Sequence, residues 1–316
     1  MTSSGLSPEL PEVVAIVGPT GVGKSAVGVE LALRVNGEVV SCDSQQVYRG
    51  MDIGTATPTE KERRGVPHHL LSMVEPGTRY HAMTYRRDAV ETIHGIVERG
   101  RRPILLGGTG FYLQALVEGL CEAPESALEV RERIQARVRK EGLETLYREL
   151  RELDPVAAER IHPNDWVRIS RALEVYEQTG KPLSSFWGQR SPAVRAIAIG
   201  LTMPLDMLTR RIKARVDRMM DCGFLEEVRV LVGRVPRKAL NVLGYNVLAD
   251  HLLGKISLDE AVEQIKRDTR RYAKRQLTWF KKRGGVKWYE LKDGFEPGRV
   301  AESILKRNLA HWIPVS

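Results

Sequence analysis

A glycine-rich loop between a short apolar run and a helical pattern constrains the fold of this chain more than any other feature. Residues 13–17 form a β-branched run typical of a buried strand, and residues 25–35 have helical periodicity. The loop fits the pattern G-x-x-x-x-G-K-[ST] in full and consists of Gly18, Pro19, Thr20, Gly21, Val22, Gly23, Lys24 and Ser25. This order predicts an α/β fold with a P-loop NTPase-like core.

The chemistry of this loop predicts a di- or triphosphate ligand. Its glycines let successive backbone N–H groups point at phosphate oxygens, and the N-terminus of the following helix adds its dipole. Lys24 adds a positive charge, and the Ser25 hydroxyl is a ligand for Mg²⁺ in such loops. The loop alone does not identify the rest of the ligand.

Further apolar runs predict a parallel sheet with helices on both faces. Residues 38–42, 103–106, 196–201 and 286–291 are candidate strands, and helical patterns such as residues 84–99 alternate with them.

Polar residues follow two of these runs. Asp43 ends the run 38–42, and Thr109 comes after two glycines that end the run 103–106. Because ligands bind at the carboxyl ends of parallel strands, we expect both side chains near the phosphate loop. Asp43 is compatible with a base, a magnesium ligand through water, a ribose contact or a helix cap, and Thr109 is equally compatible with a helix N-cap.

Strand signals stop in the middle of the chain. Residues 129–140, 143–153 and 165–179 have helical patterns instead, and the β pattern resumes at Ala196. The chain of 316 residues is long enough for a large and a smaller domain. We therefore predict an α/β core of residues 1–120 and 196–316, which carries basic helices near its C-terminus, and a helical insertion of residues 121–195.

Positive charge is concentrated near the C-terminus. The net charge is +9, and residues 266–283 carry nine basic side chains against one aspartate. Such a stripe favours a polyanionic partner, although a solvated helix face explains it equally well. Ile265, Tyr272 and Trp279 recur at intervals of seven, which predicts that they pack in the core while the basic side chains face outward.

A second group of basic residues lies on the predicted helix 206–220. Arg211, Arg215 and Arg218 follow one another at helical spacing, opposite apolar positions such as Leu208. Spacing alone favours a solvated face here.

The sequence favours a reducing cytoplasm without membrane attachment. Cys42, Cys121 and Cys222 form no C-x-x-C pair, residues 1–12 lack the features of a signal peptide, and no apolar stretch approaches 18 residues. We interpret His68 and His69 as polar loop residues, because no third metal ligand lies at a useful spacing.

Several motifs together resemble the IPP transferase family, the bacterial-type tRNA dimethylallyltransferases. The resemblance extends from about residue 13 to 280 in order. It is carried by the phosphate loop, Asp43-Ser44-Gln45-Gln46-Val47-Tyr48, Met51-Asp52-Ile53-Gly54-Thr55-Ala56, Gly107-Gly108-Thr109-Gly110-Phe111-Tyr112, Ile161-His162-Pro163-Asn164-Asp165, Arg168-Ile169-Ser170-Arg171-Ala172-Leu173-Glu174-Val175, Gly223-Phe224, Gly244-Tyr245 and Ala273-Lys274-Arg275-Gln276-Leu277-Thr278-Trp279-Phe280. Eukaryotic members add a C-terminal zinc finger, which this sequence does not contain.

The resemblance implies a prenyl transfer. A dimethylallyl group would pass from dimethylallyl diphosphate to the exocyclic amine of the adenosine 3′ to the anticodon (position 37), in tRNAs that read codons starting with U. The phosphate loop would hold the diphosphate with Mg²⁺. Asp43 would act as the base, and Thr20 and Arg215 would contact the diphosphate.

The resemblance also implies an extended surface for the tRNA anticodon stem-loop, formed by one monomer around a flipped base. The residues assigned to it are Asp43, Ser44, Gln45, Gln46, Thr109, Arg131, Val167, Arg168, Ile169, Ser170, Arg171, Asn241, Val242, Leu243, Gly244, Tyr245, Asn246, Lys274, Arg275, Gln276, Leu277, Thr278, Trp279, Phe280 and Lys281. From the residues alone, Trp279 and Phe280 are more typical of core packing than of base stacking.

Three other functions use some of the same features. A small-molecule kinase also needs Lys24, Ser25 and Mg²⁺, but it does not explain the helical insertion or the basic stripe. An adenylate isopentenyltransferase acting on free AMP or ATP needs no such RNA surface. An RNA-binding protein with an inactive site would have no use for the set of Thr20, Asp43 and Arg215.

Overall fold

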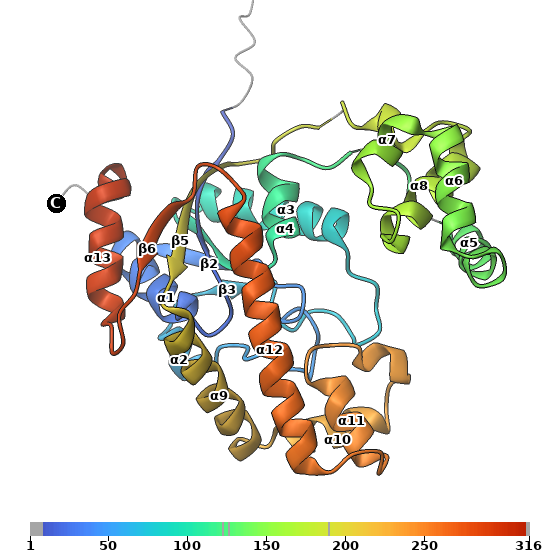
Figure 1. The fold of residues 1–316 in the computed structure, drawn as a ribbon. Coiled ribbons are helices and arrows are strands. Elements are labelled where there is room, and N and C mark those ends of the chain that lie inside the picture. The colour runs from blue at the N-terminus through green and yellow to red at the C-terminus, as the bar shows by residue number, and fades with distance from the viewer. Residues whose placement is uncertain (1–8, 122, 126, 189, 314–316) are drawn as a thin grey trace, which may run out of the picture. The chain divides into compact units, whose positions relative to one another are not determined.

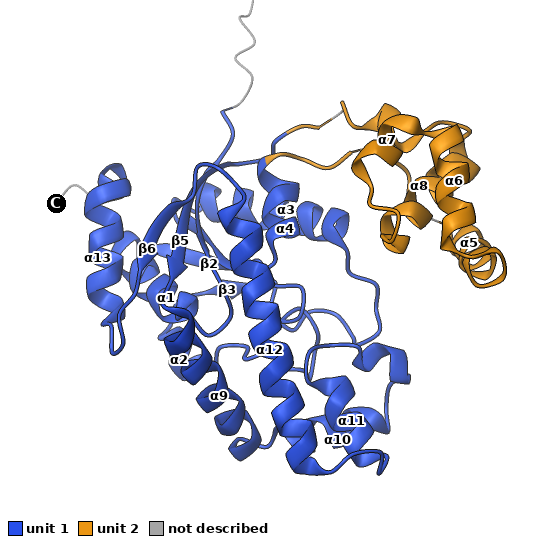
Figure 2. Cartoon of the chain, in the orientation of Figure 1, with its two compact units in different colours: residues 1–117, 192–316 blue, residues 118–191 orange. Residues whose placement is uncertain are grey.

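The chain forms two compact units, shown in different colours in Figure 2. The computed structural model describes residues 9–121, 123–125, 127–188 and 190–313. One unit comprises residues 1–117 and 192–316, and the other comprises residues 118–191. The boundaries predicted from the sequence, after residues 120 and 195, lie three and four residues beyond those in the structure.

A parallel six-stranded sheet lies at the centre of the larger unit (Figure 1). Its order is β3-β2-β4-β1-β5-β6, with strands β1 (Glu12–Val17), β2 (Gly37–Ser41), β3 (His68–His69), β4 (Arg102–Gly107), β5 (Arg195–Thr202) and β6 (Lys287–Glu290). Consecutive residues Val13–Val17 are all buried, which requires helices on both faces because successive side chains point to opposite sides. The predicted α/β class is confirmed.

The two histidines are the exception to the predicted strand pattern. His68 and His69 pair with Val39 and Val40 as an edge strand, so the loop interpretation is wrong. His69 Nε2 lies 2.7 Å from Glu38 Oε2 in β2. Neighbouring strand pairing and this polar contact, neither visible in the local sequence, convert the dipeptide into β3.

Helices complete the larger unit. They are α1 (Lys24–Val35), α2 (Glu60–Arg63), α3 (Ala82–Glu98), α4 (Gly110–Val117), α9 (Leu205–Asp221), α10 (Phe224–Val232), α11 (Tyr245–Leu252), α12 (Leu258–Lys281) and α13 (Pro297–Asn308), with 3-10 turns η2 (Arg237–Leu240) and η3 (Ala310–Trp312). A second core, around Phe224, Tyr245 and Ile265, joins α10, α11 and α12. Within the described ranges, no helix is both long and apolar enough to cross a membrane.

The smaller unit is a helical bundle with its own core. It contains α5 (Leu128–Glu141), α6 (Leu143–Leu153), α7 (Pro155–Arg160), α8 (Trp166–Thr179) and the 3-10 turn η1 (Leu183–Phe186). Ile134, Leu146 and Ile169 are buried in this core. The buried Asp154 carboxylate caps α7 through Ala157 N and also accepts from Ser184 N, so it joins two elements of the bundle.

Candidate active site

The phosphate loop winds as the sequence predicts. Gly18, Gly21 and Gly23 all have positive φ, and a Cβ on Gly18 would lie 2.4 Å from Leu201 O, so the loop is seated against the end of β5. The Lys24 ammonium donates to Gly18 O and Pro19 O, each at 3.0 Å. Burial lowers the pKa of Lys24 to about 8, and the Asp43 carboxylate acts in the opposite direction.

Helix α9 supplies two arginines to this loop. Arg215 Nη1 donates to Thr20 Oγ1 at 3.0 Å, and Arg211 Nε donates to Gly21 O at 3.1 Å. Both side chains are half-buried, whereas Arg218 is exposed. Spacing favoured a solvated face for all three residues. That expectation is wrong for Arg211 and Arg215, because tertiary packing turns their side of α9 toward the loop.

Asp43 lies at the carboxyl end of β2 and faces the same site. Its Oδ1 accepts from Gln45 N at 2.9 Å, which fixes the turn that follows the strand. Burial lowers the pKa of Arg215, and the Asp43 carboxylate opposes that shift as it does for Lys24. The same carboxylate therefore acts on two cations of the phosphate site, Lys24 and Arg215.

Thr109 joins the ends of β2 and β4. Its Oγ1 accepts from Ser44 N at 2.9 Å and also lies 3.2 Å from Ser44 Oγ, while Thr109 N donates to Cys42 O. Its hydroxyl therefore holds the segment after β2, which distinguishes it from a simple helix cap. Asp43, Thr109 and the phosphate loop meet at the edge of the sheet where parallel strands place binding groups.

A carboxylate that sequence analysis missed fixes the next loop. Glu227 Oε2 accepts from Asp52 N and Ile53 N at 2.9 and 2.8 Å, and Oε1 accepts from Gly54 N at 3.1 Å and from the Tyr245 hydroxyl at 2.6 Å. The sequence offers no signal for this role, because a glutamate in the first turn of a helix is ordinary.

The loop that Glu227 holds is tied in turn to the segment after β2. Gln46 Nε2 donates to Thr55 O and Ala56 O at 3.3 and 3.1 Å. These bonds make Gln46 a link between the two segments. Tyr245, one of the predicted RNA contacts, is buried beside Glu227. The Tyr245 hydroxyl thus serves the loop and not the surface.

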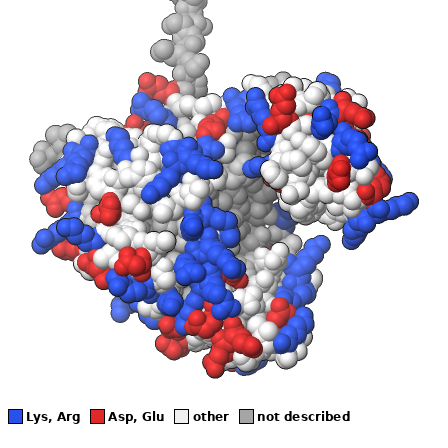
Figure 3. Space-filling model, viewed as in Figure 1, with Lys and Arg blue, Asp and Glu red and all other residues white. Residues whose placement is uncertain are grey.

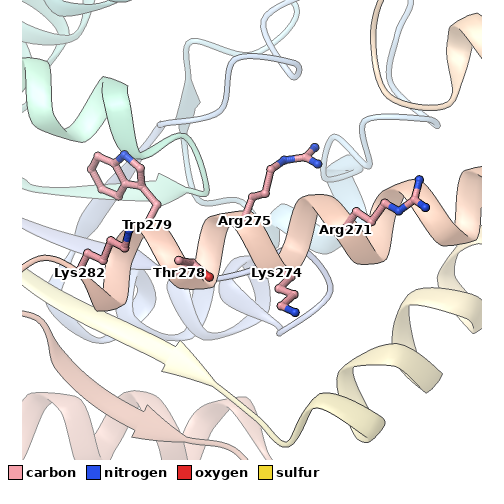
Figure 4. A pocket seen from close by; sticks show the side chains of 6 residues that line it. All are labelled: Arg271, Lys274, Arg275, Thr278, Trp279 and Lys282. Atoms are coloured by element: carbon pink, nitrogen blue, oxygen red, sulfur yellow. The ribbon is translucent and has the colours of Figure 1, made fainter. Parts of the chain in front are cut away.

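The exposed face of α12 carries a basic hollow (Figure 4). It is lined by Arg271, Lys274, Arg275, Thr278, Trp279 and Lys282. Figure 3 shows Lys and Arg side chains gathered over this part of the larger unit. Trp279 is half-buried, with the Arg283 guanidinium 4.2 Å from its ring centre. Lys274, Arg275, Thr278 and Lys281 are thus available to a ligand.

The remaining residues that the resemblance assigned to RNA differ in how far they are buried. Asn241, Val167 and Arg168 are exposed, and Leu243, Asn246 and Leu277 are half-buried. The side chains of Ile169, Ser170, Val242, Tyr245, Gln276 and Phe280 are buried, so they position their neighbours. Arg131 and Arg171 pair with the buried Glu174 carboxylate.

The buried face of α12 also differs from the predicted spacing of seven. Its buried residues are Ala261, Ile265, Thr269, Ala273, Gln276 and Phe280. Tyr272 and Trp279 are half-buried at the border of this face. Steps of three and four follow the helix period, and this buried face therefore turns two polar side chains, Thr269 and Gln276, into the interior.

Comparison with known proteins identifies the family. A family model described as IPP transferase matches residues 46–283, which are 238 of the 316 residues. The chain belongs to this family. An isopentenyl transferase model also matches residues 11–75, which include the phosphate loop and Asp43. The resemblance noted from the motifs is confirmed.

Relatives of this IPP transferase cover nearly the whole chain. A tRNA dimethylallyltransferase of Geobacter metallireducens is 46% identical over 294 residues, covering 91% of this chain and 95% of the relative. One of Thermomicrobium roseum is 49% identical over 284 residues, covering 88% and 86%.

Solved structures extend the comparison to three dimensions. The full-length tRNA isopentenylpyrophosphate transferase of Bacillus halodurans is 39% identical with a TM-score of 0.69, covering 95% of this chain and 97% of that one. A eukaryotic dimethylallyltransferase, described as acting on tRNA, is 28% identical with a TM-score of 0.82, covering 97% and 81%.

Proposed function

We propose that this IPP transferase moves a dimethylallyl group from dimethylallyl diphosphate to the exocyclic amine of the adenosine 3′ to the anticodon in tRNA. The observation that carries the proposal is that the Asp43 carboxylate lies close enough to Lys24 and Arg215, two of the cations at the phosphate loop, to interact with both charges. A base beside a diphosphate cradle is what an allylic substitution on an amine requires. The names of the relatives support tRNA as the acceptor.

The reaction forms one bond and breaks one. The adenine amine attacks the allylic carbon, and the C–O bond to the diphosphate breaks with its electron pair leaving on the diphosphate oxygen. Asp43 accepts the hydrogen bond and then the proton of the amine. Lys24, Arg215 and the loop amides stabilise the negative charge that builds on the leaving group.

Mg²⁺ fits the residues at this site. Ser25 is the second residue of α1, directly after Lys24, and it is exposed. The described residues include no cluster of three His, Cys, Asp or Glu side chains suited to a metal. In phosphate loops of this pattern, the Ser or Thr hydroxyl ligates Mg²⁺ together with oxygens of the bound phosphates. Ser25 would therefore hold the ion, which would neutralise part of the diphosphate charge.

The RNA would contact exposed groups of both units. A base must leave its stack to reach the phosphate site, so the loop around it needs contacts on the phosphate backbone. Lys274, Arg275 and Lys281 on α12, and Arg168 on α8, are exposed cations suited to this task. Val167 is also exposed on α8 and would make apolar contacts with the RNA. A small-molecule kinase or an enzyme of free AMP would have no use for them.

We also propose that the protein is located in the cytoplasm. Cys42, Cys121 and Cys222 are free thiols, which supports a reducing compartment.

Nucleoside mass analysis tests the proposal. The protein is incubated with Mg²⁺, dimethylallyl diphosphate and an unmodified anticodon stem-loop with adenosine at position 37, and the nucleosides are then identified. We expect a dimethylallyl adduct on that adenosine and none on a matched stem-loop with guanosine there. Parallel reactions contain AMP or ATP as acceptor. Prenylation of the free nucleotide alone, or phosphoryl transfer from ATP without prenylation, would reject the proposal.

A further inference from the structure

Helix α12 reaches the phosphate loop through one buried carboxamide. Gln276 Oε1 accepts from Thr20 N at 2.8 Å, and Gln276 Nε2 donates to Gly108 O at 3.0 Å. The side chain is only 6% exposed. Its two partners fix the orientation of the amide. A flipped amide would place its NH₂ group against the Thr20 N–H and its oxygen against Gly108 O, and neither pair could form a hydrogen bond.

The Gln276 carboxamide packs directly against the Gly107–Gly110 turn. A Cβ on Gly108 would lie 2.0 Å from Gln276 Nε2, so a larger residue there would displace the carboxamide. One turn earlier, Tyr272 forms hydrogen bonds with Thr109 and Gln276 that partly offset the rise in its pKa caused by burial and by Asp43. This face of α12 therefore touches the phosphate loop and the Gly107–Gly110 turn together.

Thr20 is held from two sides. Gln276 accepts from its backbone N–H, and Arg215 donates to its hydroxyl. These two contacts fix both the direction of the backbone and the rotamer of Thr20 before a ligand arrives. Because the following amides wind from this residue, its orientation sets the geometry of the cradle.

We infer that Gln276 is a positioning residue of the donor site and not a contact for RNA. This inference rests on the proposed function and deepens it: the buried face of α12 orders the diphosphate cradle, and the exposed face, with Lys274 and Arg275, serves RNA. The Gln276 side chain is buried, and its oxygen and nitrogen both bind backbone atoms of the phosphate site, so it points away from the exposed face that would meet RNA.

Loss of the carboxamide should weaken diphosphate binding selectively. In Gln276→Leu, Thr20 N–H and Gly108 C=O lose their partners. The phosphate loop is then less ordered before the ligand binds, and the free energy needed to order it reduces the affinity. We expect about tenfold weaker binding of magnesium pyrophosphate, which corresponds to the loss of one or two such bonds. Affinity for the anticodon stem-loop, and its dependence on salt, should stay within about twofold of the wild type.

Calorimetric titrations with magnesium pyrophosphate and with the stem-loop test the inference. Gln264→Leu is the matched control, because Gln264 is exposed on the same helix, and it should match the wild type in both titrations. Lys274→Ala with Arg275→Ala should show the reverse pattern, with weakened RNA binding and unchanged pyrophosphate binding. Thermal denaturation verifies that each variant is folded.

A second perturbation reaches the same contact from the other side. Gly108→Ala displaces the carboxamide without removing it and should also weaken pyrophosphate binding. The inference is overturned if both Gln276→Leu and Gly108→Ala bind pyrophosphate as the wild type does, or if Gln276→Leu loses RNA affinity alone. Failure of the wild type to bind pyrophosphate or to prenylate RNA would instead reject the proposed function.

Discussion

Replacing Glu227 by glutamine should loosen the loop around Asp52–Gly54, although the shapes of the two side chains are nearly identical. Each carboxylate oxygen accepts two hydrogen bonds, Oε2 from Asp52 N and Ile53 N and Oε1 from Gly54 N and the Tyr245 hydroxyl. In either orientation, the amide of glutamine presents its NH₂ group to two donors. No rotation restores them.

The size of the effect follows from this count. Hydrogen bonds to a charged group contribute about 1.5–3 kcal/mol each, and the variant loses two of them while the other two become neutral and weaker. Because Glu227 is half-buried, water compensates part of the loss, and we expect the free energy of unfolding to fall by about 3 kcal/mol. For a unit of this size, that corresponds to a melting temperature lower by about 5–10 °C.

Thermal and urea denaturation followed by circular dichroism measure this change. Glu226→Gln is the control, because Glu226 is exposed and pairs with Arg229 on the surface of α10. It should change stability by less than about 0.5 kcal/mol. Single-turnover prenyl transfer should also slow in Glu227→Gln, since Gln46 binds the same loop. Equal stability and rate in the two variants would refute the positioning role of Glu227.

Three further predictions concern the site itself. Asp43→Ala should lower the rate of prenyl transfer by about 10²–10⁴ and leave RNA affinity within a few-fold; a large affinity loss with normal turnover would contradict the base assignment. Reversing the charges of Lys274 and Arg275 to glutamate should weaken stem-loop binding and flatten its salt dependence, and an unchanged slope would remove α12 from the interface. Affinity for dimethylallyl diphosphate should be highest below about pH 8 and fall as the pH rises through that value, because the diphosphate favours charged Lys24 and burial lowers the pKa of the free ammonium to about 8; titrations at pH 7 to 9.5 that show constant affinity would contradict this.

The core elements of the fold were predictable because their signals are local. The strand and helix around the phosphate loop begin within one residue of the predicted positions, since β-branched runs and helical periodicity act over a few residues. The strand β3 was not predictable, because two polar residues become a strand only through pairing with β2.

The candidate site divides in the same way. Asp43 and Thr109 were placed correctly at the edge of the sheet by a general rule of parallel folds. Helical spacing did not place Arg211 and Arg215 at the loop, since it does not state which side of α9 meets the phosphate loop, and only the family resemblance directed Arg215 to this site. The contacts that Glu227 and Gln276 make with backbone atoms had no sequence signal, because those atoms lie more than 160 residues away along the chain.

The sequence by itself determined the chemistry available to this protein. It contains a phosphate-binding loop at residues 18–25, an acidic residue, Asp43, directly after a buried strand, and a concentration of positive charge at residues 266–283. The tertiary structure alone decided which side chains serve that chemistry. Gln276 stands among basic residues in the sequence, yet the helix period turns it inward to Thr20 while Lys274 and Arg275 face solvent. Direction around a helix axis and distance between remote segments are properties of the packed chain, which no local pattern contains.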